Sequence, residues 1–134
     1  MKTFLDSGVL LAAWRRTQIS DAAMSVLADD TREYFTSQLV SLEILPKARH
    51  EKNRWEQEFY ETHLARAVPC EPLSEALGTQ AENLANRYGL AGPDALQIAA
   101  AIRQGAREFI TSEKPGQPMF RVKEIRVVSL YSLA

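Results

Sequence analysis

Residues 3–7 read Thr3-Phe4-Leu5-Asp6-Ser7, a short apolar run that ends on a carboxylate and a hydroxyl. The run through Asp6 predicts a buried strand, and Ser7 offers an N-cap for a helix that continues through Trp14. The chain thus begins with a strand that passes directly into a helix. This is the opening unit of an α/β fold.

The alternation of strand and helix patterns continues to the end of the chain. Further strands are expected at residues 33–36, 67–71, 108–111 and 125–130, and further helices at 20–28, 39–45, 55–63, 74–88 and 95–102. Strands that alternate with helices favour a parallel sheet with helices on both faces. The predicted fold is a three-layer α/β/α sandwich with a central, mainly parallel sheet.

Proline, glycine and serine mark several of these boundaries. Ser37 is placed to cap the third helix, which Pro46 is expected to kink because proline lacks a backbone N–H. Pro69 predicts that the strand at 67–71 is an edge strand. Gly89 is placed to end the helix at 74–88, and Pro93 to begin the next one.

Length and composition predict an ordinary globular protein. The chain has 134 residues, 46% of them hydrophobic, and a formal net charge of −1. We expect one domain, residues 1–134, with a conventional core. Near neutrality excludes bulk electrostatic capture of nucleic acid, but it does not exclude a local basic patch.

Cysteine content and hydropathy exclude further classes of protein. Cys70 is the only cysteine, so neither an intrachain disulfide nor a cysteine-based zinc site can form. The apolar run from Gly8 to Trp14 is too short to cross a bilayer. We therefore expect a soluble, cytoplasmic protein without a signal peptide or membrane association.

Two carboxylates are expected at the carboxyl ends of strands, where open α/β sheets bind their ligands. Asp6 ends the first strand, and Glu113 lies two residues beyond Thr111 at the end of another. Each has an ordinary alternative explanation. Asp6 could simply cap a helix, and Glu113 could be a solvated loop residue.

Two more carboxylates lie on predicted helices. Glu43 has apolar neighbours on both sides and needs a partner, either Lys47 four residues on or a metal ion. Asp94 lies in the first turn of its helix, where the helix dipole alone would favour a negative charge. Converging carboxylates without His or Cys suit Mg²⁺ or Mn²⁺, which can activate water for phosphodiester hydrolysis.

The order of these segments resembles the motifs of PIN-domain ribonucleases, and most closely those of VapC-like toxins of bacterial toxin–antitoxin pairs. The matching segments are Phe4-Leu5-Asp6-Ser7, Leu42-Glu43, Pro93-Asp94-Ala95 and Phe109-Ile110-Thr111-Ser112-Glu113. The resemblance covers essentially the whole chain. It implies a PIN-like fold, metal-dependent endonucleolytic cleavage of RNA, a cognate antitoxin protein as partner, and a homodimer.

The resemblance also implies roles for individual residues. Asp6 and Asp94 are the implied principal ligands of Mg²⁺ or Mn²⁺, with Glu43 and Glu113 completing the catalytic acidic pocket. Thr111 would help to orient this site, and Ser7 is the second expected supporting residue.

Two positions depart from the family pattern. Glu113 stands where the family usually has aspartate, and Gln97 stands where many relatives carry a further acid. These departures favour an alternative hypothesis, a catalytically weak or inactive PIN-fold module that binds protein or RNA. A phosphotransferase with Asp6 as nucleophile is disfavoured, because Gly8 stands where such enzymes have a second aspartate.

A run of basic residues is the candidate RNA-binding segment. Its members are Lys47, Arg49, Lys52 and Arg54, expected to follow the third helix. Phosphate contacts from such residues would make binding dependent on salt. The ordinary alternative is a solvated helical face. Arg15, Arg16 and Lys114 are further candidates for contacts with RNA.

Overall fold

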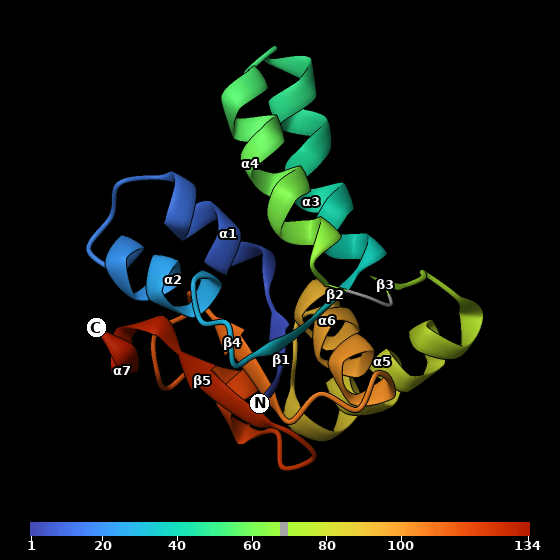
Figure 1. The fold of residues 1–134 in the computed structure, drawn as a ribbon. Helices are drawn as coiled ribbons and strands as arrows, with labels where there is room; N and C mark the ends of the chain where they lie inside the picture. Colours follow the sequence, from blue (N-terminus) through green and yellow to red (C-terminus); the bar gives the residue numbers. More distant parts are fainter. Residues whose placement is uncertain (68–69) are drawn as a thin grey trace.

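A computed structural model describes residues 1–67 and 70–134, and it has the predicted three-layer α/β/α architecture (Figure 1). The strands are β1 (Lys2–Leu5), β2 (Glu33–Ser37), β3 (Cys70–Glu71), β4 (Glu108–Thr111) and β5 (Arg126–Ser129). They form one sheet in the order β3-β2-β1-β4-β5, and every neighbouring pair is parallel. The prediction of a central parallel sheet is therefore confirmed.

Helices cover both faces of the sheet. They are α1 (Ser7–Trp14), α2 (Ser20–Leu27), α3 (Gln38–His50), α4 (Arg54–Ala65), α5 (Glu75–Tyr88), α6 (Gly92–Arg103) and α7 (Leu130–Leu133), with a 3-10 turn at Pro118–Arg121. Helices α1 and α2 lie on one side of the sheet, and α5 and α6 lie on the other (Figure 1). None of the helices in the described part of the chain has the length and apolar character of a membrane span.

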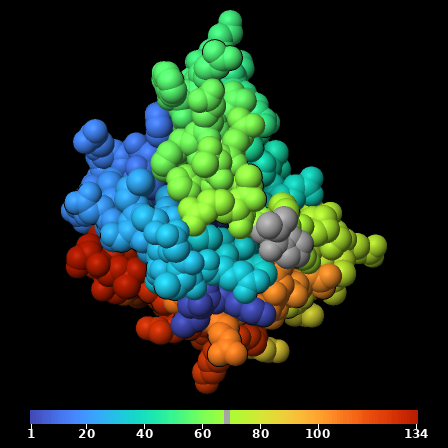
Figure 2. All heavy atoms as spheres, viewed as in Figure 1, coloured from blue at the N-terminus to red at the C-terminus, as the bar shows by residue number. Residues whose placement is uncertain are grey.

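Helices α3 and α4 pack against each other as a hairpin that projects from the rest of the molecule. Figure 2 shows this hairpin as a ridge that rises above the sheet and its covering helices. The base of α3 contacts α1, β2 and α6, so only the first turns of the hairpin lie next to the sheet. Residues near the start of α3 can therefore face the carboxyl ends of the strands.

Aromatic stacking and small side chains hold the core together. Phe4 on β1 and Phe109 on β4 stack with ring centroids 5.4 Å apart, and both are fully buried. On α6, Ala99, Ala100 and Ala101 are fully buried as well. Methyl side chains let this helix lie close to its neighbours at the density of a protein interior. The nearly all-apolar pattern predicted at 95–102 reflects this burial.

Helix caps explain most of the boundaries. The side chains of Ser37 and Ser74 each accept a hydrogen bond from the backbone N–H three residues on, and Gly89 ends α5 with a φ of 71°. These boundaries are as predicted. At α1, however, the cap is Asp6 rather than Ser7, because the Asp6 carboxylate accepts the Ser7 N–H at 2.8 Å. The strand therefore ends at Leu5.

Helix α3 is longer than the sequence predicts. It continues through Pro46 to His50, so Lys47 and Arg49 lie in its last turn and not after it. Packing against α4 buries Ala48 in this turn, which offsets the backbone hydrogen bond that proline cannot make. Basic side chains in the last turn also suit the helix dipole.

Both ends of the sheet differ in detail from the prediction. The strand expected at 67–71 is present as Cys70–Glu71 and lies at the edge of the sheet, whereas Val68 and Pro69 lie outside the described residues. The last strand ends at Ser129, one residue earlier than expected, because the Ser129 side chain caps α7. The sequence analysis did not predict this short helix.

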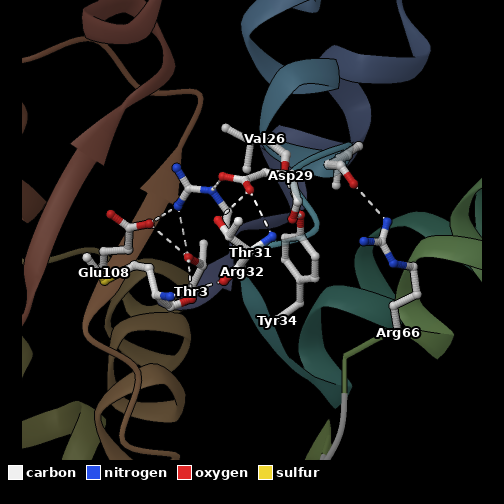
Figure 3. Close-up of polar contacts among 10 residues, drawn as sticks. Thr3, Val26, Asp29, Thr31, Arg32, Tyr34, Arg66 and Glu108 are labelled. Atoms are coloured by element: carbon white, nitrogen blue, oxygen red, sulfur yellow. Dashed lines mark hydrogen bonds and ion pairs between the residues drawn. The ribbon is translucent and has the colours of Figure 1, made fainter.

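A buried ion pair lies at the amino ends of β1 and β4 (Figure 3). The predicted carboxylates Asp6 and Glu113 follow the carboxyl ends of the same two strands. Glu108, only 6% exposed, binds the guanidinium of Arg32, and the Thr3 hydroxyl donates to the same carboxylate at 2.8 Å. Arg32 also binds Asp29 at 3.0 Å. The cluster ties the loop before β2 to the two central strands.

A second set of polar contacts, also drawn in Figure 3, joins the end of α4 to the end of α2. Arg66 donates to the carbonyl of Leu27 at 2.7 Å, and its guanidinium lies 4.8 Å from the centre of the Tyr34 ring. The Tyr34 hydroxyl in turn lies 2.8 Å from the carbonyl oxygen of Asp29. The base of the projecting hairpin is thereby fixed to the body of the protein.

The buried pair gives a prediction about stability. Glu108→Ala leaves Arg32 without its buried counter-charge, so we expect a loss of about 3 kcal/mol or more in the free energy of unfolding. Glu58→Ala is the matched control, because its ion pair with Arg54 is exposed (3.7 Å) and is worth about 0.5 kcal/mol or less. Urea unfolding at pH 7 measures both. Equal losses in the two variants would contradict a structural role for the buried pair.

Candidate active site

The carboxyl ends of β1 and β4 meet at the point where the strand order reverses. From β1 the chain adds β2 and then β3 on one side, whereas β4 and β5 lie on the other. Connections that leave a parallel sheet in opposite directions open a crevice at this point. The Asp6 N–H donates to the carbonyl of Ile110 at 3.1 Å, which fixes Asp6 at the mouth of that crevice.

Both oxygens of the Asp6 carboxyl group are held by neighbours. Oδ1 accepts the Ser7 N–H at 2.8 Å, and Oδ2 accepts the hydroxyl of Thr111 at 3.0 Å. Thr111 is fully buried, and its Oγ1 also accepts the backbone N–H of Glu113 at 3.2 Å. The two predicted supporting residues, Ser7 and Thr111, thus both contact Asp6, and Thr111 links it to Glu113.

The predicted carboxylates lie close enough to repel one another. Burial raises the pKa of Asp6 to about 7, the Thr111 hydrogen bond opposes this shift, and the charges of Asp94 and Glu43 add to it. Burial also raises the pKa of Asp94, and the charges of Glu113 and Glu43 raise it further. The charges of all four predicted acids therefore contribute to one electronegative region at the switch point.

The four acids divide into an inner pair and an outer pair. Asp6 and Asp94 are half-buried, whereas Glu43 on α3 and Glu113 after β4 are exposed residues at the rim. Within residues 1–67 and 70–134, no group of three or more acidic, histidine or cysteine side chains is arranged to hold one metal ion. The side chains are neighbours, but they do not form a closed cage of protein ligands.

The donor chemistry at this site suits a hard divalent cation. The four acids in the electronegative region offer carboxylate oxygen, the ligand that Mg²⁺ and Mn²⁺ prefer. Mg²⁺ commonly takes only one or two carboxylates and keeps several water ligands. The inner pair, Asp6 and Asp94, supplies two carboxylates, a number within that range.

In the described chain the side chain that contacts Glu43 is Gln97 and not Lys47. The Oε1 atom of Glu43 accepts a hydrogen bond from Nε2 of Gln97 at 2.9 Å. Among the described residues, Glu43 and Lys47 form no ion pair within 4.0 Å. Sequence reasoning noted Gln97 only as a departure from the family, because nothing local to Glu43 indicates a partner 54 residues away.

Close packing between α1 and the segment after β4 sets the width of the site. A Cβ atom at Gly8 would lie 2.0 Å from Oγ of Ser112 and 2.9 Å from its Cβ, closer than such atoms can approach. Glycine is therefore required at this position. Gly8 follows Asp6 by two residues and Ser112 directly precedes Glu113, so this contact brings the segments of two predicted acids together.

The four predicted RNA-binding residues lie along the projecting hairpin. Arg49 lies 4.0 Å from Glu61 and Arg54 lies 3.7 Å from Glu58, both in exposed ion pairs. Lys52 lies in the turn between α3 and α4 with a φ of 54°. Of the four, Lys47 is nearest in the chain to Glu43, one helical turn away.

A groove of about 370 Å³ runs between α1 and the hairpin, next to the acidic region. Its lining residues are Leu11, Trp14, Arg15, Glu43, Ile44, Lys47, Glu51 and Glu56. A second hollow of about 260 Å³ lies on the other side of α1, between Gly8, Arg15, Ser112 and Tyr131. Arg15 borders both hollows, and in the groove Arg15 and Lys47 lie among three acids, Glu43, Glu51 and Glu56.

Solved structures of similar fold come from bacterial toxin–antitoxin systems. VapBC2 from Rickettsia felis, bound to a DNA fragment from its promoter, matches with a TM-score of 0.70 and 16% identity over 96% of this chain and 98% of that one. A toxin–antitoxin complex from Klebsiella pneumoniae gives 0.68 and 19% over 96% and 98%.

A third structure of similar fold belongs to a protein described by its activity. The Mycobacterium tuberculosis toxin VapC20, which cleaves the sarcin-ricin loop, matches with a TM-score of 0.68 and 18% identity over 92% of this chain and 98% of that one. At these identities the likeness establishes the fold. A search among curated proteins gave no match.

The sequence itself matches a family model. The model of the PIN domain matches residues 3–114, a span that includes β1 from Thr3 onward, the switch point and all four predicted acids. The parallel sheet, the strand order and the solved structures of similar fold agree with this match. The chain belongs to the PIN domain family.

Proposed function

We propose that this protein is a metal-dependent endoribonuclease that acts as the toxin of a toxin–antitoxin pair. The observation that carries the proposal is the Asp6 carboxyl group, which is half-buried at the switch point and opposed there by the charges of Asp94 and Glu43. Buried like charges destabilise a fold unless something compensates them. A divalent cation is the compensation that this donor set suits, and PIN family membership supports nuclease activity.

Each acid has a role in this proposal. Asp6 and Asp94 would hold Mg²⁺ or Mn²⁺, and Glu43 and Glu113 would add negative charge at the rim. The Ser7 N–H and the Thr111 hydroxyl bind the two oxygens of Asp6, which fixes the orientation of its carboxylate. When bound, the cation supplies positive charge that activates water and offsets the charge on the leaving oxygen of a phosphodiester.

RNA is the substrate class that we propose. Arg15 and Lys47 line the groove that Glu43 also lines, so a nucleic-acid backbone lying there could place its phosphates against both cations. The other predicted RNA-binding residues lie farther out. Seven residues separate Glu43 from the end of α3, which is about 10 Å along a helix, so we assign Arg49, Lys52 and Arg54 secondary contacts at most.

A cognate antitoxin protein is the proposed partner, and the proposed assembly is a homodimer in the cytoplasm. The fold is shared with a Klebsiella pneumoniae protein that was solved in a toxin–antitoxin complex. The groove between α1 and the hairpin offers a partner both apolar contacts, from Leu11 and Trp14, and charged ones.

The competing hypothesis is a PIN-fold binding module without catalytic activity. It is favoured by one observation, the lack of three metal-ligating side chains around a common point within the described residues. The two hypotheses differ in whether the purified protein hydrolyses RNA.

We predict metal-dependent cleavage of RNA by the purified protein. Asp6→Asn and Asp94→Asn should each lower the cleavage rate at least about 100-fold, because each removes one negative charge from the proposed metal site. Gel analysis of labelled RNA with Mg²⁺, with Mn²⁺ and with EDTA measures this, and Glu58→Ala is the control for a lost surface charge. Equal cleavage by all variants would indicate a contaminating nuclease. Absence of cleavage across a panel of structured RNAs would favour the binding module.

We also predict that Asp6→Asn stabilises the metal-free protein at alkaline pH. Because the folded-state pKa of Asp6 is raised from 3.8 to about 7, its contribution to stability is present below pH 4 and is lost as the pH rises through 7. The variant should therefore match the wild type near pH 4 and exceed it by about 1–3 kcal/mol at pH 8. Urea unfolding in EDTA at both pH values tests this. A variant less stable than the wild type at pH 8 would contradict the account.

A further inference from the structure

A chain of three side chains runs from the start of α3 to the rim of the acidic region. The Oγ atom of Ser37 accepts the Val40 N–H at 3.2 Å as the cap of α3, and the Ser37 hydroxyl donates to Oε1 of Gln97 at 2.7 Å. Gln97 then donates from Nε2 to Oε1 of Glu43 at 2.9 Å. Each residue comes from a different element: the end of β2, α6 and α3.

Chemistry fixes the direction of every bond in this chain. A backbone N–H can only donate, so Ser37 accepts from Val40 and has a single proton left to give. That proton goes to the Gln97 carbonyl oxygen, which turns the amide nitrogen toward Glu43. The opposite orientation of the amide would place its oxygen against the carboxylate, and two acceptors repel each other.

Burial makes the first two links rigid. Ser37 is 1% exposed and Gln97 is 2% exposed, whereas Glu43 is an exposed residue. A buried amide that lost its partners would cost free energy, so Gln97 is strongly held in this orientation. An exposed glutamate without a partner would sample many rotamers. The hydrogen bond from Gln97 therefore converts a mobile carboxylate into a fixed one.

We propose that Gln97 is a positioning residue: held by the cap of α3 through Ser37, it fixes the Glu43 carboxylate at the rim of the site for cation binding. One oxygen of Glu43 is bound to Gln97, and the other is left to contribute to the site. The inference rests on the proposed function, because it assigns Glu43 a part in binding the divalent cation. It also gives a role to the amide that stands where many relatives carry an acid.

The hydrogen bond from Gln97 to Glu43 links the proposed cation binding to the position of the hairpin. Glu43 lies in the second turn of α3, and Ser37 caps that helix while also orienting Gln97. A movement of α3 relative to α6 would break the bond between Gln97 and Glu43.

Mn²⁺ affinity of the purified protein is the direct test, measured by the electron paramagnetic resonance signal of free Mn²⁺. Gln97→Met keeps the size of the side chain and removes both hydrogen bonds. We expect it to weaken Mn²⁺ binding about tenfold, as loss of an outer-shell partner commonly does. In a Glu43→Ala background, Gln97→Met should cause no further loss, because Gln97 acts through Glu43.

The matched control uses a second serine cap with nearly the same backbone geometry. Ser74 caps α5 at φ −133° and ψ 164°, compared with −131° and 162° for Ser37, and it accepts the Leu77 N–H at 3.1 Å. Ser37→Ala and Ser74→Ala should each lower Tm by about 3–6 °C through loss of a cap. Only Ser37→Ala should also weaken Mn²⁺ binding.

Several outcomes would overturn the inference. Unchanged Mn²⁺ affinity in Gln97→Met would do so, as would equal losses of affinity in Ser37→Ala and Ser74→Ala, which would indicate a purely structural effect. A wild-type protein that binds no Mn²⁺ would refute the proposed function together with this role. The NMR signals of the Gln97 side-chain amide separate these cases. Because Gln97 donates to Glu43 in the wild type, these signals should differ between metal-free wild type and metal-free Glu43→Ala.

Discussion

The hydrogen bonds to Asp6 are the constraint on which the site depends. This one residue binds β4 through its N–H, caps α1 through one carboxylate oxygen and binds the buried hydroxyl of Thr111 through the other. The position of its charge is therefore set by three hydrogen bonds to two elements, β4 and α1, at the switch point of the sheet. Burial raises the pKa of Asp6 to about 7, so the fold holds a carboxyl group that is costly to ionise where the proposed cation site needs negative charge.

Charged groups are compensated at the amino ends of β1 and β4 but not at their carboxyl ends. At the amino ends of β1 and β4, the Glu108 carboxylate is buried together with Arg32, so the charges compensate each other within the chain. At the carboxyl ends, the charges of Asp94 and Glu43 raise the pKa of Asp6, and the charges of Glu113 and Glu43 raise that of Asp94. The group that contacts Glu43 there is the Gln97 amide and not a cation. Charge is thus compensated within the chain at the amino ends of these strands, and the uncompensated charge at their carboxyl ends is available for a ligand.

Local patterns predicted the elements of this fold well, because caps and periodicity act over a few residues. Ser37, Ser74 and Gly89 mark helix ends that the structure has, and the strand at 108–111 has the predicted bounds. The groups that hold the acids in place were missed because they are partners far apart in the chain. The contact between Gln97 and Glu43 spans 54 residues, and that between Thr3 and Glu108 spans 105. Sequence periodicity carries no information about such pairs, so the acids were predictable as candidates, whereas the groups that hold them were not.

Anomalous diffraction from crystals grown with Mn²⁺ at pH 8 tests the central claim most directly. If the inner acids form a cation site, an anomalous peak will lie about 2.2 Å from carboxylate oxygens of both Asp6 and Asp94. The peak should be absent from crystals of Asp94→Asn grown in the same way. Wild-type crystals at saturating Mn²⁺ that show no peak between these two carboxylates, or a peak bound only to other residues, would contradict the account.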